Sequence, residues 1–135
     1  MQYLRVLNKR QSLLAASAGQ GADDSHSDRG IVQGHAYTVL RLKAVEGFRF
    51  VRFRNPWGKF EWDGAWSDAS PLWTQHPRVA VKLRQEAVDD GAFWMEWSDV
   101  LTHFHNFDVC ARTRGTPLTS SRFVFRIKFT CFGIL

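Results

Sequence analysis

Residues 34–68 read GHAYTVLRLKAVEGFRFVRFRNPWGKFEWDGAWSD, and they contain the strongest structural signals of the sequence. Residues 36–45 and 48–54 are rich in Val, Leu, Phe and Tyr, and in part they alternate apolar with basic or polar residues. Glu46-Gly47 separates the two runs, and its glycine can take the positive φ that a tight turn needs. The pattern therefore predicts two antiparallel strands joined as a hairpin.

A histidine and an asparagine flank this hairpin. His35 stands eleven positions before Glu46, and Asn55 stands eight positions after Gly47. Both residues are therefore expected at the same end of the ladder, offset by about three residues at roughly 3.3 Å each, which a β-bulge or strand twist can close. We therefore predict that His35 and Asn55 lie close together in space although 20 positions separate them in the sequence.

An imidazole beside a carboxamide has a specific chemical use. The amide oxygen of Asn55 can accept a hydrogen bond from one ring N–H of His35, which fixes the tautomer and the orientation of the ring. The other ring nitrogen is left to exchange a proton with a nucleophile. Proteases with a Cys-His-Asn active site work in this way.

Further motifs accompany the pair in a fixed order. They are Gly34-His35-Ala36-Tyr37, Arg54-Asn55-Pro56-Trp57-Gly58, Glu61-Trp62-x-Gly64-Ala65-Trp66-Ser67-Asp68 and Asp90-Gly91-x-Phe93-Trp94-Met95. With these motifs, roughly residues 12–113 resemble the second lobe of the calpain protease core, a papain-like cysteine peptidase. The order of all four motifs makes the resemblance specific, whereas GHAY alone would be weak.

The resemblance implies an α+β fold in which an antiparallel sheet or partial barrel carries short helices. Residues 1–113 would be the lobe that bears the catalytic His35 and Asn55, with Trp57 lining the cleft. In this family the corresponding Trp also wedges between the two lobes of the idle enzyme. Residues 114–135 would be a tail, which either begins the β-sandwich that follows the core in calpains or results from a truncated or mispredicted reading frame.

The family's first lobe supplies a Cys nucleophile and a Gln oxyanion donor, and we expect that lobe to be absent from this chain. Cys110 lacks the Gln-x-Gly-x-Cys-Trp context of calpain nucleophiles, so its strand position indicates a small buried residue. His35 and Asn55 alone are therefore not expected to hydrolyse peptides at a useful rate.

Calcium is a further trait that the resemblance implies. The second-lobe ligands of calpains correspond here to the carboxylates of Glu61, Asp68 and Asp90 and the backbone carbonyl of Val88, while Ala92 replaces an acidic ligand. Such a site is weakened by the lost carboxylate. The alternative, that Glu61 and Asp68 merely border Trp-rich turns, carries about equal weight. We expect no organic cofactor.

Composition limits the other readings. At 135 residues and 44% hydrophobic, the chain can form one domain or one lobe of a larger one. The net charge of +5 comes from the flanks, since residues 59–108 carry nine acidic and four basic side chains. We therefore expect protein substrates and a Cys-bearing calpain lobe as partners, and neither nucleic acid nor a membrane span. Two cysteines without CxxC spacing indicate a reducing, cytoplasmic location.

The remaining segments give weaker predictions. Residues 12–17 form a short apolar run that is compatible with a helix turn or a strand, and the calpain resemblance favours a strand. Residues 19–29 are expected to form an exposed loop, and residues 77–88 a helix or irregular segment. Residues 92–97 and 107–113 are expected to be strands. They flank a short helix that Ser98 caps and that runs to about His105, and an alternating pattern follows over 123–131.

Three function hypotheses follow. The first is the His/Asn lobe of an intracellular calpain-like cysteine endopeptidase, and the second is a non-catalytic calpain-like regulatory or interaction protein. A Trp-rich β module that binds carbohydrate or single-stranded nucleic acid is a distant third. Against the third, we expect Trp57, Trp62 and Trp66 to pack around the His35–Asn55 pair.

Overall fold

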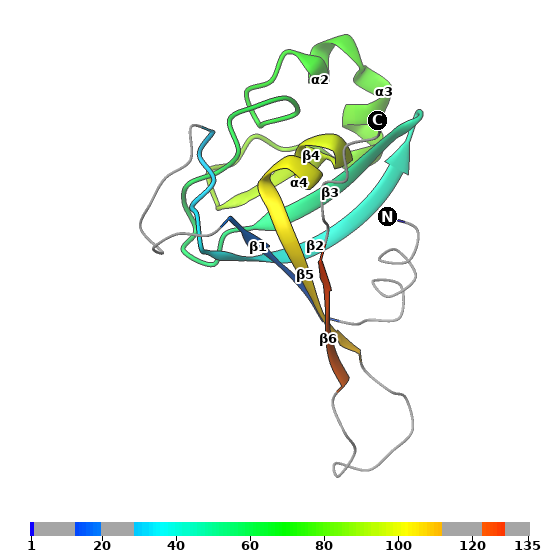
Figure 1. Cartoon of the computed structure of the whole chain (residues 1–135). Coiled ribbons are helices and arrows are strands. Elements are labelled where there is room, and N and C mark those ends of the chain that lie inside the picture. Colours follow the sequence, from blue (N-terminus) through cyan, green and yellow to red (C-terminus); the bar gives the residue numbers. More distant parts are fainter. Residues whose placement is uncertain (2–12, 20–28, 112–122, 129–135) are drawn as a thin grey trace, which may run out of the picture.

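A six-stranded antiparallel sheet forms the frame of the part of the chain that the structure describes (Figure 1). The computed structural model describes residue 1 and residues 13–19, 29–111 and 123–128. The strands are β1 (Leu13–Ala18), β2 (Ala36–Val45), β3 (Phe48–Arg54), β4 (Ala92–Glu96), β5 (Phe104–Ala111) and β6 (Phe123–Lys128). They lie in the order β4-β3-β2-β1-β5-β6, and every neighbouring pair is antiparallel.

The β2–β3 hairpin has the boundaries that the sequence predicts. Val45 pairs with Phe48 across the turn, where Glu46 (φ 50°) and Gly47 (φ 84°) both take positive φ. Two positive φ values in a two-residue loop are typical of a type I′ turn, whose twist matches that of the strands. The register then shifts between Val39 and Arg41. This irregularity supplies part of the correction that the His35–Asn55 offset requires.

Three short helices complete the described part of the chain. They are α2 (Leu72–Gln75), α3 (Pro77–Leu83) and α4 (Trp97–His103). Helix α3 ends where Arg84 takes a left-handed φ of 53°. The prediction that Ser98 caps α4 was wrong. The N-cap residue is Glu96, whose carboxylate accepts a hydrogen bond from the Ser98 N–H at 2.7 Å. The helix also ends earlier than expected, since Phe104 begins β5.

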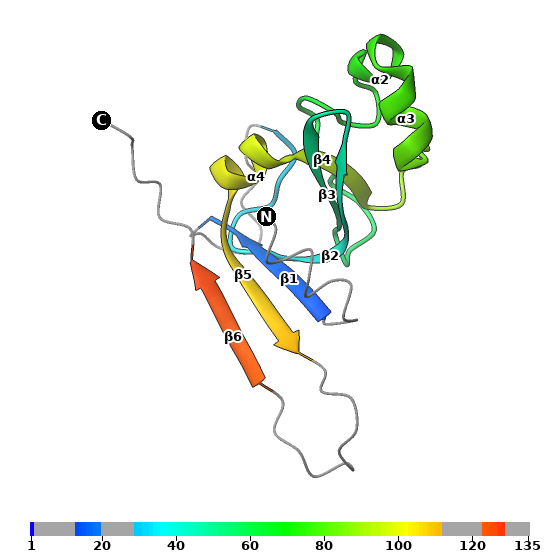
Figure 2. The same cartoon turned by 90° about the vertical axis from the view of Figure 1, so that its right-hand side faces the viewer.

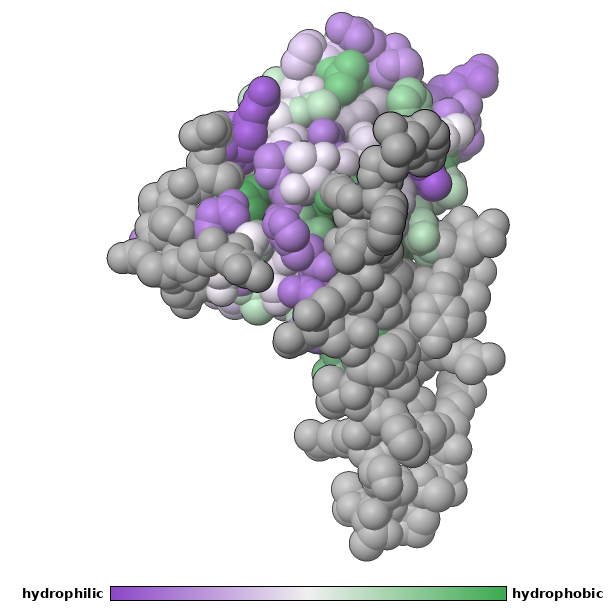
Figure 3. All heavy atoms as spheres, in the orientation of Figure 1, coloured by the Kyte–Doolittle hydropathy of each residue, from purple (hydrophilic) through white to green (hydrophobic). Residues whose placement is uncertain are grey.

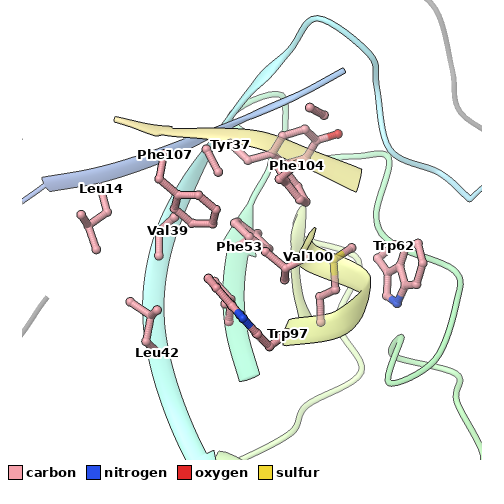
Figure 4. Close-up of a cluster of buried hydrophobic side chains, with 14 of the residues drawn as sticks. Leu14, Tyr37, Val39, Leu42, Phe53, Trp62, Trp97, Val100, Phe104 and Phe107 are labelled. Carbon is pink, nitrogen blue, oxygen red and sulfur yellow. The ribbon is translucent and has the colours of Figure 1, made fainter. Parts of the chain in front are cut away.

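The larger hydrophobic core, called here the first cluster, lies on one face of the sheet and against α4 (Figure 4). Cross-strand register aligns Val39, Phe53 and Phe93 on that face. The rings of Phe53 and Phe104 stack with centroids 4.4 Å apart. Its buried members are Leu14, Ala16, Ala18, Ile31, Tyr37, Val39, Leu42, Val51, Phe53, Trp62, Phe93, Met95, Trp97, Val100, Phe104, Phe107 and Val109.

A second cluster lies on the opposite face, because side chains alternate along a strand. Phe50 points into it, whereas its neighbour Val51 belongs to the first cluster. Helices α2 and α3 cover the hairpin end of this face (Figure 2). The buried members are Val45, Phe50, Trp66, Trp73, Val79, Leu83 and Trp94.

The architecture confirms the expected α+β class with a dominant antiparallel sheet and short helices. The sheet is open: it twists strongly but does not close into a barrel (Figure 2). Strand β6 extends this same sheet by pairing with β5. Whether residues 114–135 belong to a following domain stays a prediction.

The surface of the described residues shows few large apolar groups. On the face in Figure 3, hydrophilic and hydrophobic side chains are interspersed over the α2–α3 end of the molecule. None of the described helices has the length and apolar character needed to cross a lipid bilayer. The exposed large hydrophobic residues are Leu13, Leu40, Trp57, Phe60, Val81 and Val88. Trp57 and Phe60 are ring neighbours, with centroids 6.4 Å apart.

Candidate active site

His35 and Asn55 meet at one end of the β2–β3 hairpin, which confirms the predicted spatial pair. His35 directly precedes β2 and Asn55 directly follows β3. The His35 Nε2 atom lies 3.0 Å from Asn55 Oδ1. The Asn55 side chain is fully buried and His35 is 6% exposed. The pair is therefore held away from water. In the protein interior the hydrogen bond between the two side chains is stronger than it would be in solvent.

The backbone around His35 is tied to β1. The His35 carbonyl accepts a hydrogen bond from the Ala18 N–H at 3.1 Å, and Gly34 N–H donates to the Ala18 carbonyl at 2.8 Å. Gly34 takes a φ of 69°, which favours glycine. The chain therefore enters β2 through a defined turn that fixes the position of the imidazole.

The side-chain amide of Asn55 has all of its hydrogen-bonding groups occupied. Oδ1 accepts a second hydrogen bond from the Trp57 N–H at 3.0 Å. Nδ2 faces the carbonyls of Lys59 at 2.6 Å and Phe60 at 3.4 Å. These partners fix which end of the amide is oxygen, and an amide oxygen can only accept. His35 Nε2 must therefore donate, so a neutral ring carries its proton there and Nδ1 is the nitrogen that can receive one.

Aromatic rings border the imidazole on two sides. The Trp57 ring lies 4.2 Å from the His35 ring between centroids, tilted by 42°. Tyr37 approaches edge-on, with centroids 5.2 Å apart. Tyr37 is itself oriented by the Val32 N–H, which donates to its hydroxyl at 2.9 Å. Trp57 remains 43% exposed, so it covers one side of the ring while presenting its own outer surface to solvent.

Trp62 and Trp66 were expected beside the pair as well; for Trp66 this was wrong, and for Trp62, whose ring lies 4.9 Å from that of His103, it stays a prediction. Trp62 belongs to the first cluster, whereas Trp66 packs in the second cluster. The chain bends between them: the Trp62 ring lies so close to Gly64 that an added Cβ would be 2.0 Å from its Cζ2. Trp62, Trp66 and Trp73 are all under 8% exposed, so these rings form no stacking platform for sugars or bases.

The acidic residues of the candidate calcium site gather around residues 88–92 and bind the backbone there. Glu61 Oε1 accepts hydrogen bonds from the Asp90 N–H at 3.1 Å and the Gly91 N–H at 2.6 Å. Asp68 Oδ2 accepts a hydrogen bond from the Val88 N–H at 3.2 Å, and Asp90 Oδ1 accepts one from the Ala92 N–H at 2.9 Å. All three predicted carboxylates thus converge on one short segment.

The electrostatic environment of this segment is unfavourable to negative charge. Burial raises the pKa of Glu61, and the nearby carboxylates of Asp68 and Asp89 raise it further, against the opposing effect of its two backbone N–H partners. The pKa of Asp68 is also raised, mainly by burial, with Asp90 and Asp89 adding to it while the Val88 N–H and Arg52 oppose it. A cation would relieve this repulsion.

The donor types fit calcium, which prefers hard oxygen ligands. Within the described ranges, however, no group of three or more His, Cys, Asp or Glu side chains is gathered as a metal site. The Val88 carbonyl, the fourth predicted ligand, accepts the Asp90 N–H at 2.8 Å. The oxygens are therefore engaged with backbone N–H groups in this conformation.

Cys110 lies at the far end of β5 from the pair. It is opposite Leu13 in the β1–β5 ladder, whereas Phe104 is opposite Ala18, which bonds to the His35 backbone. The five residue-to-residue steps from Leu13 to Ala18 correspond to roughly 16 Å along the strand. Cys110 is a half-buried free thiol and is not a partner for the imidazole. His26 and Cys131 lie outside the described residues.

Sequence reasoning missed the backbone groups that hold Asn55. The carbonyls of Lys59, Phe60 and Gly91 bond to its side-chain and main-chain N–H groups. Phe60 also takes a φ of 61°, which is uncommon for a residue other than glycine. Carbonyl partners leave no signal in residue types, and only the glycines at 58 and 91 hint at a close backbone approach.

Comparison with known proteins agrees with this geometry. The family described as calpain family cysteine protease matches residues 1–111. The calpain-type cysteine protease DEK1 of Arabidopsis thaliana is 46% identical over 99 residues, which are 73% of this chain and 5% of that protein. Calpain-12 of Mus musculus is 41% identical over 115 residues, which are 80% of this chain and 16% of that protein. Calpain-9 of Rattus norvegicus is 39% identical over 120 residues, which are 83% of this chain and 17% of that protein. The chain thus spans less than a fifth of these relatives, and it belongs to the calpain family of cysteine proteases.

Proposed function

We propose that this chain supplies the His/Asn half of the active site of a calpain-like cysteine endopeptidase that acts on protein substrates. The observation that carries the proposal is the buried hydrogen bond between His35 Nε2 and Asn55 Oδ1. This bond leaves Nδ1 as the proton acceptor, which is the arrangement that activates a thiol in Cys-His-Asn chemistry. Membership of a cysteine protease family supports the same reaction class.

The two residues have distinct roles in this proposal. His35 Nδ1 takes the proton from a cysteine thiol on a partner lobe and returns it to the leaving amine of the cleaved peptide. Asn55 holds the ring in the required tautomer and stabilises the imidazolium without a buried carboxylate. The cysteine and the oxyanion donor come from the Cys-bearing lobe of a calpain core, because the 135 residues contain no Gln-x-Gly-x-Cys-Trp motif. A reducing cytoplasmic environment keeps such a thiol available.

The decisive experiment combines the chain with a separately produced Cys-bearing lobe of a calpain. We expect no peptide hydrolysis and no epoxysuccinyl labelling by the 135-residue chain alone, and measurable turnover after mixing. His35→Ala should abolish that turnover, a loss of about 10²–10⁴-fold, because it removes the proton acceptor. Asn55→Ala should reduce it less, because the ring remains and only its orientation is lost.

The matched control is His105→Ala, which removes an exposed histidine of β5. It should leave turnover unchanged. Robust hydrolysis by the chain alone that disappears in Cys110→Ser would refute the assignment of the nucleophile. Turnover after mixing that survives His35→Ala would refute the proposed role of the imidazole. A mixture that binds but stays inactive would favour a regulatory calpain-like module.

We also propose that Glu61, Asp68, Asp90 and the Val88 carbonyl bind calcium when the segment at 88–92 rearranges. The repulsion among these carboxylates and their hard oxygen donors support this. Bound calcium would neutralise their charge and hold the segment in place. Titration calorimetry should show calcium binding that Asp68→Asn weakens and that Asp63→Asn, at an exposed position of the same loop, leaves unchanged. Equal binding by both variants would exclude this site.

A further inference from the structure

The turn at residues 89–91 is in direct backbone contact with the loop that carries Asn55. The Asn55 N–H donates to the Gly91 carbonyl at 2.8 Å, and the Gly58 N–H donates to the Asn55 carbonyl at 3.0 Å. A Cβ added at Gly91 would lie 2.8 Å from Gly58 Cα and 2.9 Å from the Asn55 carbonyl oxygen. Real Cβ atoms do not approach backbone so closely, so this contact exists only because residue 91 has no side chain.

Glu61 holds this turn from the other side. Its Oε1 atom accepts the N–H groups of both Asp90 and Gly91, and the bond from Gly91 is 2.6 Å long. Hydrogen bonds to an ionised carboxylate are stronger than neutral ones. The contacts therefore run without a gap from Glu61 through Gly91 to the Asn55 backbone, and from the Asn55 side chain to His35.

We propose that Glu61 and Gly91 are positioning residues that set the place of Asn55 and, through it, the orientation of His35. This inference rests on the proposed role of the pair, but it assigns a function to two residues that act on Asn55 through backbone contacts. The side chain of Asn55 bonds to four groups within 3.5 Å, so a displaced backbone cannot keep them all. Misplacement of a reacting group by about 1 Å costs about 10²-fold in rate.

Gly91→Ala tests the contact, and Gly47→Ala is its matched control. The two glycines have almost the same φ, 83° and 84°, so alanine meets the same positive-φ strain at both. A Cβ at Gly47 meets nothing within 4 Å, whereas at Gly91 it meets the Asn55 loop. Nuclear magnetic resonance of ¹⁵N-labelled chain in chelator should show the Asn55 side-chain amide and His35 Nε2 signals shifted in Gly91→Ala and unshifted in Gly47→Ala.

Glu61 provides a second test that holds even if Gly91→Ala fails to fold. Without the carboxylate, hydrogen exchange at the Asn55 backbone amide should be about tenfold faster in Glu61→Ala. Glu61→Gln keeps an acceptor oxygen and should restore exchange to within about twofold of the wild type. Glu86→Ala, at an exposed position of the chain, should have no effect.

The inference is overturned if Glu61→Ala leaves both the Asn55 exchange rate and the His35 signals unchanged. It is also overturned if Gly47→Ala shifts those signals as much as Gly91→Ala does, because the effect would then be general strain. These readouts report the geometry of the pair and need no hydrolysis. An inactive mixture in the mixing experiment would therefore count against the proposed function only. The positioning role of Glu61 and Gly91 is decided separately, by the spectra and the exchange rates.

Discussion

The two hydrophobic clusters lie on opposite faces of the same sheet, and they are built in different ways. The first cluster joins β1, β2, β3, β4 and β5 with α4, and through Tyr37 it reaches the His35 ring. The second cluster is more local, because Trp66, Trp73 and α3 all come from residues 66–83 and cover only the hairpin end. From this difference we expect that lost packing in the first cluster disturbs the site, while lost packing in the second chiefly weakens the hairpin.

Phe53→Ala should have the largest effect, because it removes the centre of the first cluster. The Phe53 ring is fully buried, stacks on Phe104 at 4.4 Å and lies 5.8 Å from Phe93. We expect a loss of about 3–5 kcal/mol in the free energy of unfolding, measured by urea denaturation. We also expect shifted Asn55 side-chain signals, since Asn55 follows two residues later. Unshifted signals in the folded variant would break the link between this cluster and the site.

Trp73→Phe should have a smaller effect and spare the site. The Trp73 Nε1–H donates to the Ser67 carbonyl at 2.7 Å in the second cluster, and phenylalanine loses this bond and some buried area. A loss of about 1–2 kcal/mol in the free energy of unfolding is expected. The His35 and Asn55 signals should stay in place. If they move as in Phe53→Ala, the two clusters are not separable and the comparison fails.

The hairpin and the pair were predictable because their signals are local and repeated. Alternation over 36–45 and 48–54, with Glu46-Gly47 between them, predicts both strands with the boundaries that the structure shows. The resemblance to calpains assigns the four motifs to one lobe.

Other features depend on tertiary contacts that residue types do not encode. Glu96 caps α4 in place of Ser98 because β4 ends directly against the helix and brings the carboxylate to the Ser98 N–H. Trp62 and Trp66 are only four residues apart, yet a bend at Gly64 sends them to different clusters. The contact at Gly91 joins segments more than 30 residues apart, so only the folded chain reveals it.

The tautomer of His35 tests the central claim most directly. At a pH where the ring is neutral, ¹⁵N-edited spectra of the labelled chain distinguish a proton on Nε2 from one on Nδ1. Because Asn55 Oδ1 can only accept, and lies 3.0 Å from Nε2, we predict a single tautomer with the proton on Nε2. Asn55→Ala should allow the second tautomer to appear. A wild-type ring protonated on Nδ1 would contradict the account, because Nδ1 would then have no lone pair to receive a proton from a thiol.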